Sequence, residues 1–391
     1  MQTGNKAKKR KSNGQWISIL LYLLIGAACG ILMVMYLERP DQAEKGFSSN
    51  ILSFVLMFLG MYAAMLIQII LHEAGHLIFG LLTGYRFSSF RIAHLMWVRL
   101  DGRIRFRKLN IAGTGGQCLM LPPDLKDGKM PVMLYNFGGA IVNLVTAVVS
   151  VGLSFLCPVH SLGWTLLMIF AVIGLAFALI NGLPIQMGPV NNDGKNAFDL
   201  ARSEEATRAF WIQMKANEQI SRGIRLKDMP AEWFEVPSGK SMDNGIIATI
   251  GVLACNRLMD QHRFEEADQL MKRLLSTQNG IIGLYRNLML CDRMYVEMIS
   301  ENRPEVLADM RTGDQLKMMK AMKKYPSVLR TEYVYAFLAE KDRAKAEKVL
   351  EQFDRQAGTY PYPSEIEGER ELIRIAQSLN QQGVPGERAV Q

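Results

Sequence analysis

Residues 65–80 read MLIQIILHEAGHLIFG, an apolar run that carries two histidines and a glutamate. On a helix, His72 and His76 lie one turn apart and point the same way, so their two imidazoles can hold one metal ion. Glu73 then flanks the pair as a general base, as in the helical His-Glu-x-x-His zinc pattern. Ionisable groups are costly in hydrocarbon and usually mark function there. The stretch therefore predicts a zinc metalloprotease site inside a membrane-spanning helix.

The 391 residues around this stretch change composition near residue 200. The first half contains four apolar runs, each long enough to cross a hydrocarbon slab of about 30 Å as a helix. These runs cover residues 17–37, 51–83, 133–156 and 162–183. The second half has no such run, and its amphipathic periodicity is typical of soluble helices. We expect an all-α polytopic membrane protein with about four transmembrane helices, joined to a soluble α-helical domain.

Cysteine usage excludes two common kinds of site. The five cysteines are scattered along the chain, without a CxxC pair or an even framework. Neither a disulfide scaffold nor a cysteine-bound zinc is therefore predicted.

Lysine and arginine placement predicts the orientation, because basic loops stay on the cytoplasmic side. Residues 1–16 hold five basic residues, loop 84–131 holds seven between positions 86 and 108, and loop 38–50 holds only Arg39 and Lys45. The turn near His160 has none. We expect a multi-pass protein of the cell membrane, bacterial because organelle signals are lacking, with the amino terminus and the carboxy-terminal domain in the cytoplasm. The net charge of +8 then reflects topology and attraction to the anionic lipid bilayer rather than binding of nucleic acid.

Helix rise places the histidines inside the bilayer, nearer its cytoplasmic face. The run extends about 32 Å from residue 51 to His72, and only about 12 Å from His76 to residue 84. Gln68 falls on the same stripe one turn before His72. It is a candidate for orienting a substrate or supporting a metal ligand, and an interhelical hydrogen bond is the alternative role.

A catalytic zinc site needs a third protein ligand and one open position for water. Residues 181–194 read NGLPIQMGPVNNDG and follow the fourth apolar run. Their prolines and glycines should break the helix, and broken backbone at membrane depth must line a cavity or be buried in protein. Asp193 would complete a His-His-Asp set that brings water to a pKa near ~7, with Glu73 passing its proton to the leaving amine. An ordinary polar loop leaving the membrane is the alternative.

Together these motifs resemble the site-2 protease family of intramembrane zinc metalloproteases. The resemblance rests on HEAGH at 72–76, on Asn181-x-x-Pro184 with Asp193-Gly194, and on GGAIVN at 138–143, which is similar to the family's Gly-x-x-x-Asn stretch. It covers about residues 50–200 and implies a three-helix core that cleaves transmembrane segments of other proteins. It also implies one Zn²⁺ held by His72, His76 and Asp193, a catalytic Glu73, and contacts of Asn143 and Asn181 with the substrate or transition state.

Two features depart from the family pattern. The stretch between Pro184 and Asp193 is longer than in many members, so Asn191 or Asn192 is an alternative neighbour of the metal. Residues 85–130 are too few for the PDZ domain of one branch, and their alternating apolar residues predict a β-hairpin around Asp101-Gly102. This β-rich loop is either re-entrant beside the active site, offering an edge to an unwound substrate, or a plain cytoplasmic hairpin.

Residues 201–380 are predicted to form helical hairpins that resemble tetratricopeptide units, and residues 381–391 a flexible tail. Ala267, Ala308 and Ala346 mark a loose period of about 40 residues, longer than the usual ~34. Such a surface could bind a protein partner or a substrate tail, or could serve only to pack and stabilise.

Two other classes of protein remain open on the sequence. One is a prenyl-protein-type membrane zinc protease, which would need a downstream glutamate ligand such as Glu204 or Glu205. The other is a catalytically inactive scaffold that anchors a helical-repeat domain to the bilayer.

Overall fold

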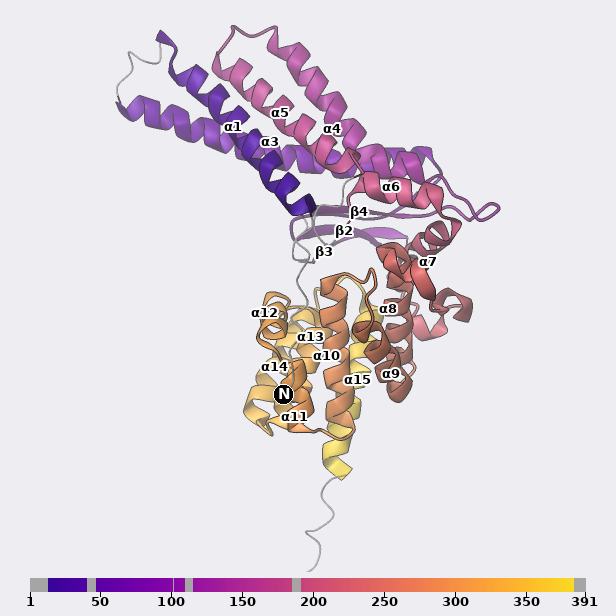
Figure 1. Ribbon diagram of the computed structural model, residues 1–391. Helices are drawn as coiled ribbons and strands as arrows, with labels where there is room; N and C mark the ends of the chain where they lie inside the picture. The colour runs from indigo at the N-terminus through magenta and orange to yellow at the C-terminus, as the bar shows by residue number, and fades with distance from the viewer. Residues whose placement is uncertain (1–12, 41–46, 101, 110–114, 185–190, 383–391) are drawn as a thin grey trace, which may run out of the picture. The chain divides into compact units, whose positions relative to one another are not determined.

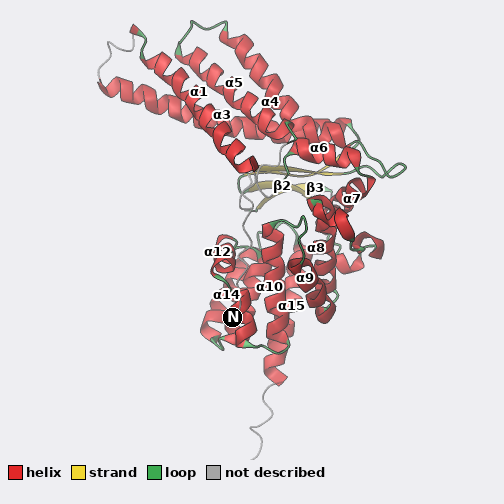
Figure 2. Cartoon of the chain, viewed as in Figure 1, coloured by secondary structure: helices red, strands yellow, loops and turns green. Residues whose placement is uncertain are grey.

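The computed structural model describes residues 13–40, 47–100, 102–109, 115–184 and 191–382 (Figure 1). These residues are mostly helical, with one small antiparallel sheet (Figure 2). The predicted class, a helical protein with apolar helices and a little β-structure, is confirmed at this level. Residues 1–12 of the predicted basic segment and residues 383–391 of the predicted tail lie outside the described part.

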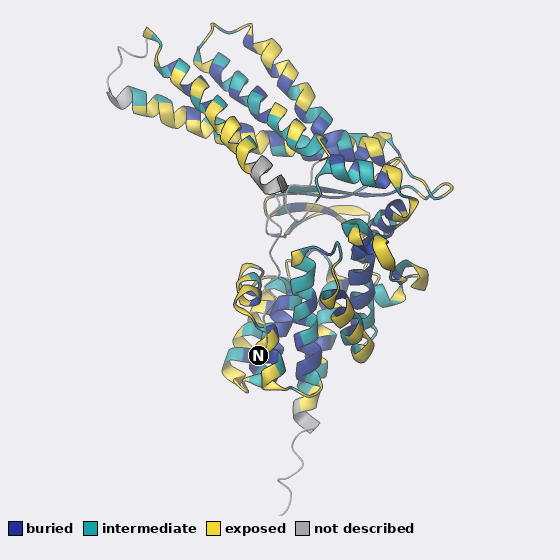
Figure 3. Ribbon diagram, viewed as in Figure 1, coloured by how far each residue is buried: buried dark blue, intermediate teal, exposed yellow. Residues whose placement is uncertain are grey.

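Within the described residues, four helices are long and apolar enough to cross a bilayer. They are α1 (Asn13–Leu37), α3 (Phe47–Leu82), α4 (Val132–Ser154) and α5 (Leu162–Gly182). Many of their leucines, isoleucines, valines and phenylalanines are exposed, as the yellow stretches of Figure 3 show. Exposure of so large an apolar surface to water is unfavourable, whereas the hydrocarbon chains of lipids would cover it. The four predicted runs are thus found as helices compatible with membrane spans.

By their internal contacts, the residues group into two compact units, Met1–Gly84 with Pro131–Arg202 and Tyr85–Met130 with Ser203–Gln391. The division near residue 202 lies close to the composition change. The β-rich segment 85–130, which the sequence assigned to the metalloprotease core, groups instead with the helical unit. The reason is packing, because Met96, Val98 and Leu100 are buried in the same core as the helices of that unit.

In the first unit, α4 packs along α5 and α3, and α1 along α5. The crossing of α3 and α4 is very close, since a Cβ atom built on Gly75 would lie 2.2 Å from the carbonyl oxygen of Gly138. At the other end of the helices, Arg39 Nη1 donates a hydrogen bond of 3.2 Å to the carbonyl oxygen of His160. The segment after α1 and the turn between α4 and α5, which the sequence predicts on the same side of the membrane, are therefore in contact. A short helix, α6 (Asp193–Arg202), packs on α4 and α5.

The sheet of the second unit has the strand order β3-β2-β1-β4. Its strands are β1 (Arg86–Ile92), β2 (Leu95–Leu100), β3 (Arg103–Lys108) and β4 (Gly116–Leu121). The predicted hairpin is β2 with β3, where Leu100 pairs with Arg103; Asp101 in its turn lies outside the described residues. The sheet is larger than the predicted hairpin, because β1 also pairs with β2 on one side and with β4 on the other.

Helices form the rest of the second unit. Neighbours in sequence pair as hairpins, α8 with α9 and α13 with α14, and α15 packs against α13, α10 and α7. Ala267 and Ala346 are fully buried in two of these hairpins, whereas Ala308 is exposed and does not continue the predicted period. The elements are α7 (Glu204–Ser221), η1 (Leu226–Asp228), η2 (Ala231–Phe234), η3 (Gly239–Asp243), α8 (Gly245–Asp260), α9 (Phe264–Ser276), α10 (Gly283–Ile299), α11 (Pro304–Met310), α12 (Gly313–Ala321), α13 (Pro326–Val334), η4 (Tyr335–Ala339), α14 (Arg343–Ala357) and α15 (Pro363–Gln382).

Candidate metal centre

Two imidazoles on α3 face one another. The four-residue spacing places His72 and His76 on consecutive turns, where their ring centroids are 4.8 Å apart and the rings are nearly perpendicular. Their Nε2 atoms lie 3.2 Å from each other. The helix thus brings two nitrogen atoms to one point, as the sequence pattern predicted.

Asp193 reaches the same point from α6. It is the first residue of that helix, where the positive end of the helix dipole favours a carboxylate. The preceding Asn192 fixes the position, because its Nδ2 donates to the carbonyl oxygens of Ile180 and Leu183, each at 2.6 Å. Its Oδ1 accepts a hydrogen bond from the Lys195 backbone N–H. Asn192 therefore joins the start of α6 to the end of α5.

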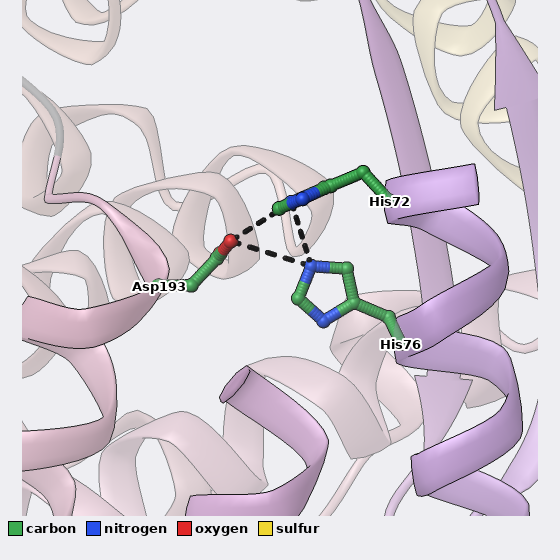
Figure 4. Close-up of side chains that lie close together, drawn as sticks. All are labelled: His72, His76 and Asp193. Carbon is green, nitrogen blue, oxygen red and sulfur yellow. Dashed lines mark hydrogen bonds and ion pairs between the residues drawn. The ribbon is translucent and has the colours of Figure 1, made fainter. Parts of the chain in front are cut away.

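The three side chains converge as Figure 4 shows. Asp193 Oδ2 lies 3.0 Å from His72 Nε2 and 3.4 Å from His76 Nε2. A tetrahedral zinc ion with bonds of roughly 2.0–2.1 Å keeps its ligand atoms about 3.3 Å apart. The three separations match that spacing, so among the described residues His72, His76 and Asp193 form a group that could hold a metal ion.

Hydrogen bonds at the far side of each ring decide which nitrogen faces the centre. His72 Nδ1 lies 2.7 Å from Asn143 Oδ1, and His76 Nδ1 lies 2.8 Å from the Tyr135 carbonyl oxygen. Both partners are acceptors, so each Nδ1 carries the proton and each Nε2 directs a lone pair inward. Two lone pairs and a carboxylate at one point repel each other unless a cation lies between them. The donor set therefore suits a divalent metal ion.

Asn143 is itself held in place by Gln68. Asn143 Nδ2 donates to the backbone oxygen of Gln68 at 3.0 Å and to its Oε1 at 2.7 Å, which leaves Oδ1 facing His72. Gln68 Nε2 donates to the Phe170 carbonyl oxygen on α5 at 3.3 Å. Gln68 and Asn143 are both fully buried. Gln68 thus forms interhelical hydrogen bonds to α4 and α5, which was one of its predicted roles. Through Asn143 these bonds also hold the ring of His72 in place.

Glycines of α4 make room for this network. A Cβ atom on Gly139 would lie 2.4 Å from Cε1 of His72, so any larger residue would displace the imidazole. Gly138 lets the α4 backbone approach Gly75, one residue before His76. Glycine is needed here for closeness rather than for unusual backbone angles. The GGAIVN stretch thus places two glycines against α3 and, one turn after Gly139, Asn143 against His72.

The remaining predicted residues are placed as follows. Glu73 is on the same turn of α3 as the histidines and is 8% exposed. Asn181 Nδ2 donates to the Phe177 carbonyl oxygen within its own helix at 3.1 Å. Asn191 Nδ2 lies 3.4 Å from Asp199 Oδ2. The structure brings Gln68, His72, His76, Asn143 and Asp193 into one connected network. Residues 185–190, in the proline-containing stretch, lie outside the described part.

Sequence reasoning missed Tyr135 and the connecting role of Asn192. Tyr135 contributes its backbone carbonyl, which no side-chain pattern can reveal. Asn192 was considered only as a neighbour of the metal, although an asparagine directly before a helix is a recognisable cap.

The centre is partly open. The side chains of His72 and His76 are 12% and 10% exposed, and that of Asp193 is 25% exposed. The side of the centre on which Asp193 lies is therefore accessible for a further ligand.

Comparisons with protein-family models, with curated proteins and with solved structures find no match for this chain.

Proposed function

We propose that this protein is a zinc-dependent intramembrane protease that resembles the site-2 protease family and hydrolyses peptide bonds in or near transmembrane segments of other proteins. The observation that carries the proposal is the convergence of Asp193, from α6, with His72 and His76, which lie on a helix long and apolar enough to span a bilayer. The ligand atoms are 3.0–3.4 Å apart. Two imidazoles and one carboxylate leave one position of a tetrahedral zinc ion open.

The donor set favours zinc over the harder cations. Magnesium and calcium prefer six or more oxygen ligands, whereas two imidazole nitrogens and one carboxylate are typical of zinc. A bound zinc ion supplies Lewis-acid activation of water and of the scissile carbonyl.

The protein's own residues transfer the proton and position the metal-binding groups. Glu73 accepts a proton from the attacking water and delivers it to the leaving amine nitrogen. Asn143 and the Tyr135 carbonyl oxygen keep both imidazoles in the tautomer that presents Nε2. Asn192 holds Asp193 at the centre through the ends of α5 and α6.

Transmembrane segments are the substrate class that fits this location. A helical peptide bond is shielded by its own hydrogen bonds, so the substrate must unwind locally, and each unpaired backbone group costs several kcal/mol in hydrocarbon. Residues that weaken a helix should therefore govern the choice of cleavage site more than a particular side chain does.

The prenyl-protein-type alternative requires a glutamate ligand. The metal-binding group found among the described residues contains Asp193 and no glutamate. Glu204 is 72% exposed and lies 4.0 Å from Lys129 Nζ. Substitution separates the two hypotheses, because Asp193→Ala should abolish cleavage in our proposal and Glu204→Ala should leave it unchanged. The scaffold alternative predicts no cleavage at all.

Cleavage of membrane substrates tests the proposal directly. The chain and its Glu73→Gln variant would be co-expressed with a panel of single-span proteins tagged at both ends, some with glycine or proline within the span. We expect fragments only with the unsubstituted chain, at equal levels of the two proteins. Identical fragment patterns for both would end the protease hypothesis.

A further inference from the structure

One face of the β2–β3 hairpin is exposed, and the proposed protease chemistry does not use it. We call it the outer face; its side chains are those of Trp97, Arg99, Ile104, Phe106 and Lys108. Trp97 on β2 pairs directly with Phe106 on β3. Two residues along each strand, Arg99 pairs with Ile104. Paired residues of antiparallel strands lie on the same side of a sheet, so these side chains share one surface.

The opposite face of β2 packs on the protein. Met96, Val98 and Leu100 are at most 5% exposed and belong to the core that this strand shares with the helices of its unit. Successive residues of a strand point to opposite sides, so burial of this face leaves the outer face pointing away from that core. The hairpin is therefore fixed from one side and open on the other.

Apolar side chains make up much of the outer face although they are exposed. Trp97 is 39%, Phe106 47% and Ile104 59% exposed. The rings of Trp97 and Phe106 contact each other edge to face, with centroids 5.8 Å apart. Contiguous apolar groups on a surface are unfavourable in water and often mark a site that binds a partner or a membrane.

The charge around this apolar cluster is positive. The four strands contain seven arginines and lysines and no aspartate or glutamate. On the outer face, Arg99 and Lys108 are exposed, and neither forms an ion pair with another described residue. Arg103 and Arg105 on the edge strand β3 are exposed as well. Such a surface is complementary to molecules that carry phosphates together with an apolar or stacking part, namely anionic lipids and nucleic acids.

The position of the sheet in the sequence favours a lipid. Only residues 83–85 separate β1 from the apolar helix α3, and the step from Leu82 to Arg86 spans at most roughly 14 Å. A bilayer crossed by α3 is therefore within reach of the sheet. Tryptophan beside arginine and lysine is typical of protein surfaces in the headgroup region. Ile104, the most exposed apolar residue of the face, has no ring to stack on a base but can insert between lipid chains.

We propose that the outer face binds the surface of a bilayer that contains anionic lipids. Trp97, Ile104 and Phe106 lie among the headgroups and the upper part of the acyl chains, and Arg99 and Lys108 contact lipid phosphates. The sheet is then neither a re-entrant loop inside the bilayer nor a hairpin free in the cytoplasm. The inference rests on α3 crossing the bilayer and on no step of the protease chemistry.

Quenching of Trp97 fluorescence by brominated lipids tests the proposal. The full chain would be placed in nanodiscs of phosphatidylcholine with bromines on part of the acyl chains, with or without added phosphatidylglycerol. Subtracting the emission of Trp97→Phe isolates Trp97 from the other tryptophans. We expect quenching of Trp97 in discs that contain phosphatidylglycerol, and at least about twofold less in discs without it. High salt should lower the quenching in the anionic discs, because it screens the attraction.

Two charge-matched pairs of substitutions localise the effect. Arg99→Gln with Lys108→Gln should reduce the quenching of Trp97 in anionic discs at least about twofold. Lys240→Gln with Lys348→Gln removes two exposed lysines that also have no ion pair among the described residues, and should leave the quenching unchanged. Circular dichroism establishes that both double variants fold.

Three results would overturn the proposal. They are absence of quenching of Trp97, equal quenching with and without the anionic lipid, and equal losses in the two double variants. A fluorescent single-stranded oligonucleotide is the alternative probe. If it binds the chain and loses affinity in the variant at Arg99 and Lys108, while lipids leave Trp97 unquenched, the outer face is a nucleic-acid site and the lipid proposal is wrong.

Discussion

Each imidazole of the candidate centre is oriented by one hydrogen bond at Nδ1. For His72 that partner is the side chain of Asn143, which can be changed without touching a metal-ligating atom. For His76 it is a backbone carbonyl, which substitution cannot remove. Asn143 is therefore the residue at which the supporting role can be tested.

We predict that Asn143→Ala lowers zinc affinity about 10–100-fold, because His72 loses the acceptor that fixes its tautomer and ring orientation. Titration of the purified chain against a competing chelator measures the affinity. Asn136→Ala is the matched control, since Asn136 is buried on the same helix but, among the described residues, its side chain donates to the local Val132 carbonyl oxygen. Equal affinities of the two variants would refute the role of Asn143.

We predict that Gly139→Ala impairs zinc binding while leaving the chain folded, because the added methyl group would lie 2.4 Å from His72 Cε1. Gly152→Ala lies on the same helix, where a methyl group meets no atom within 4 Å. Metal content after purification should fall for the first variant and stay unchanged for the second. Full zinc content in Gly139→Ala would show that the ring tolerates the displacement.

Among the helices, α6 determines where the carboxylate of the candidate centre lies, because Asp193 is its first residue. Asn192 caps this helix and bonds two carbonyl oxygens at the end of α5. The position of the carboxylate thus depends on a connection between two helices rather than on Asp193 alone.

We predict that Asn192→Ala weakens zinc binding several-fold, since losing a helix cap costs about 1 kcal/mol and here also frees the start of α6. Asn191→Ala, whose side chain lies 3.4 Å from Asp199, is the neighbouring control. The chelator titration applies again. A loss confined to Asn191→Ala would contradict the assignment of the cap.

Sequence patterns predicted helices and strands correctly where the pattern lies within one short segment of the chain. Apolar length alone located the four long helices, and the alternation in 95–108 located the β2–β3 hairpin. The pairing of β1 with β4 was missed, because it joins segments separated by the whole hairpin. At the centre, His72, His76 and Asp193 were identifiable from residue type and spacing, whereas the Tyr135 carbonyl and the Gln68–Asn143 bonds depend on helix packing that one sequence does not display.

At the scale of the whole molecule, the two units carry different kinds of buried charge. In the membrane-compatible unit, two imidazoles and one carboxylate converge on a point that could hold a cation. In the helical unit, burial raises the pKa of Asp292, Glu365 and Glu369. Stability of that unit should therefore depend on pH.

We predict that the unfolding free energy of the helical unit decreases as pH rises from about 4.5 to about 7. Unfolded Glu365 loses its proton near its ordinary pKa of 4.5, whereas folded Glu365 keeps the proton until about pH 7. The folded state binds more protons in this window, so raising the pH favours unfolding, by up to about 3 kcal/mol from this group. Above pH 7 its contribution no longer changes.

Urea unfolding at pH 5 and pH 7.5, followed by circular dichroism, measures this slope. Glu365→Gln should flatten it, with a remainder from Asp292 and Glu369. Glu351→Gln, which removes an exposed carboxyl of a surface pair, should not alter it. Equal slopes in all three proteins would contradict the role of Glu365.

Metal content is the most direct test of the account, because every proposed catalytic step depends on a cation at His72, His76 and Asp193. Elemental analysis of the purified full chain should find about one zinc ion per chain, retained in Glu73→Gln and Glu204→Ala but lost in His72→Ala and Asp193→Ala. An unsubstituted chain without a stoichiometric divalent ion, or full zinc content in Asp193→Ala, would contradict the proposed centre.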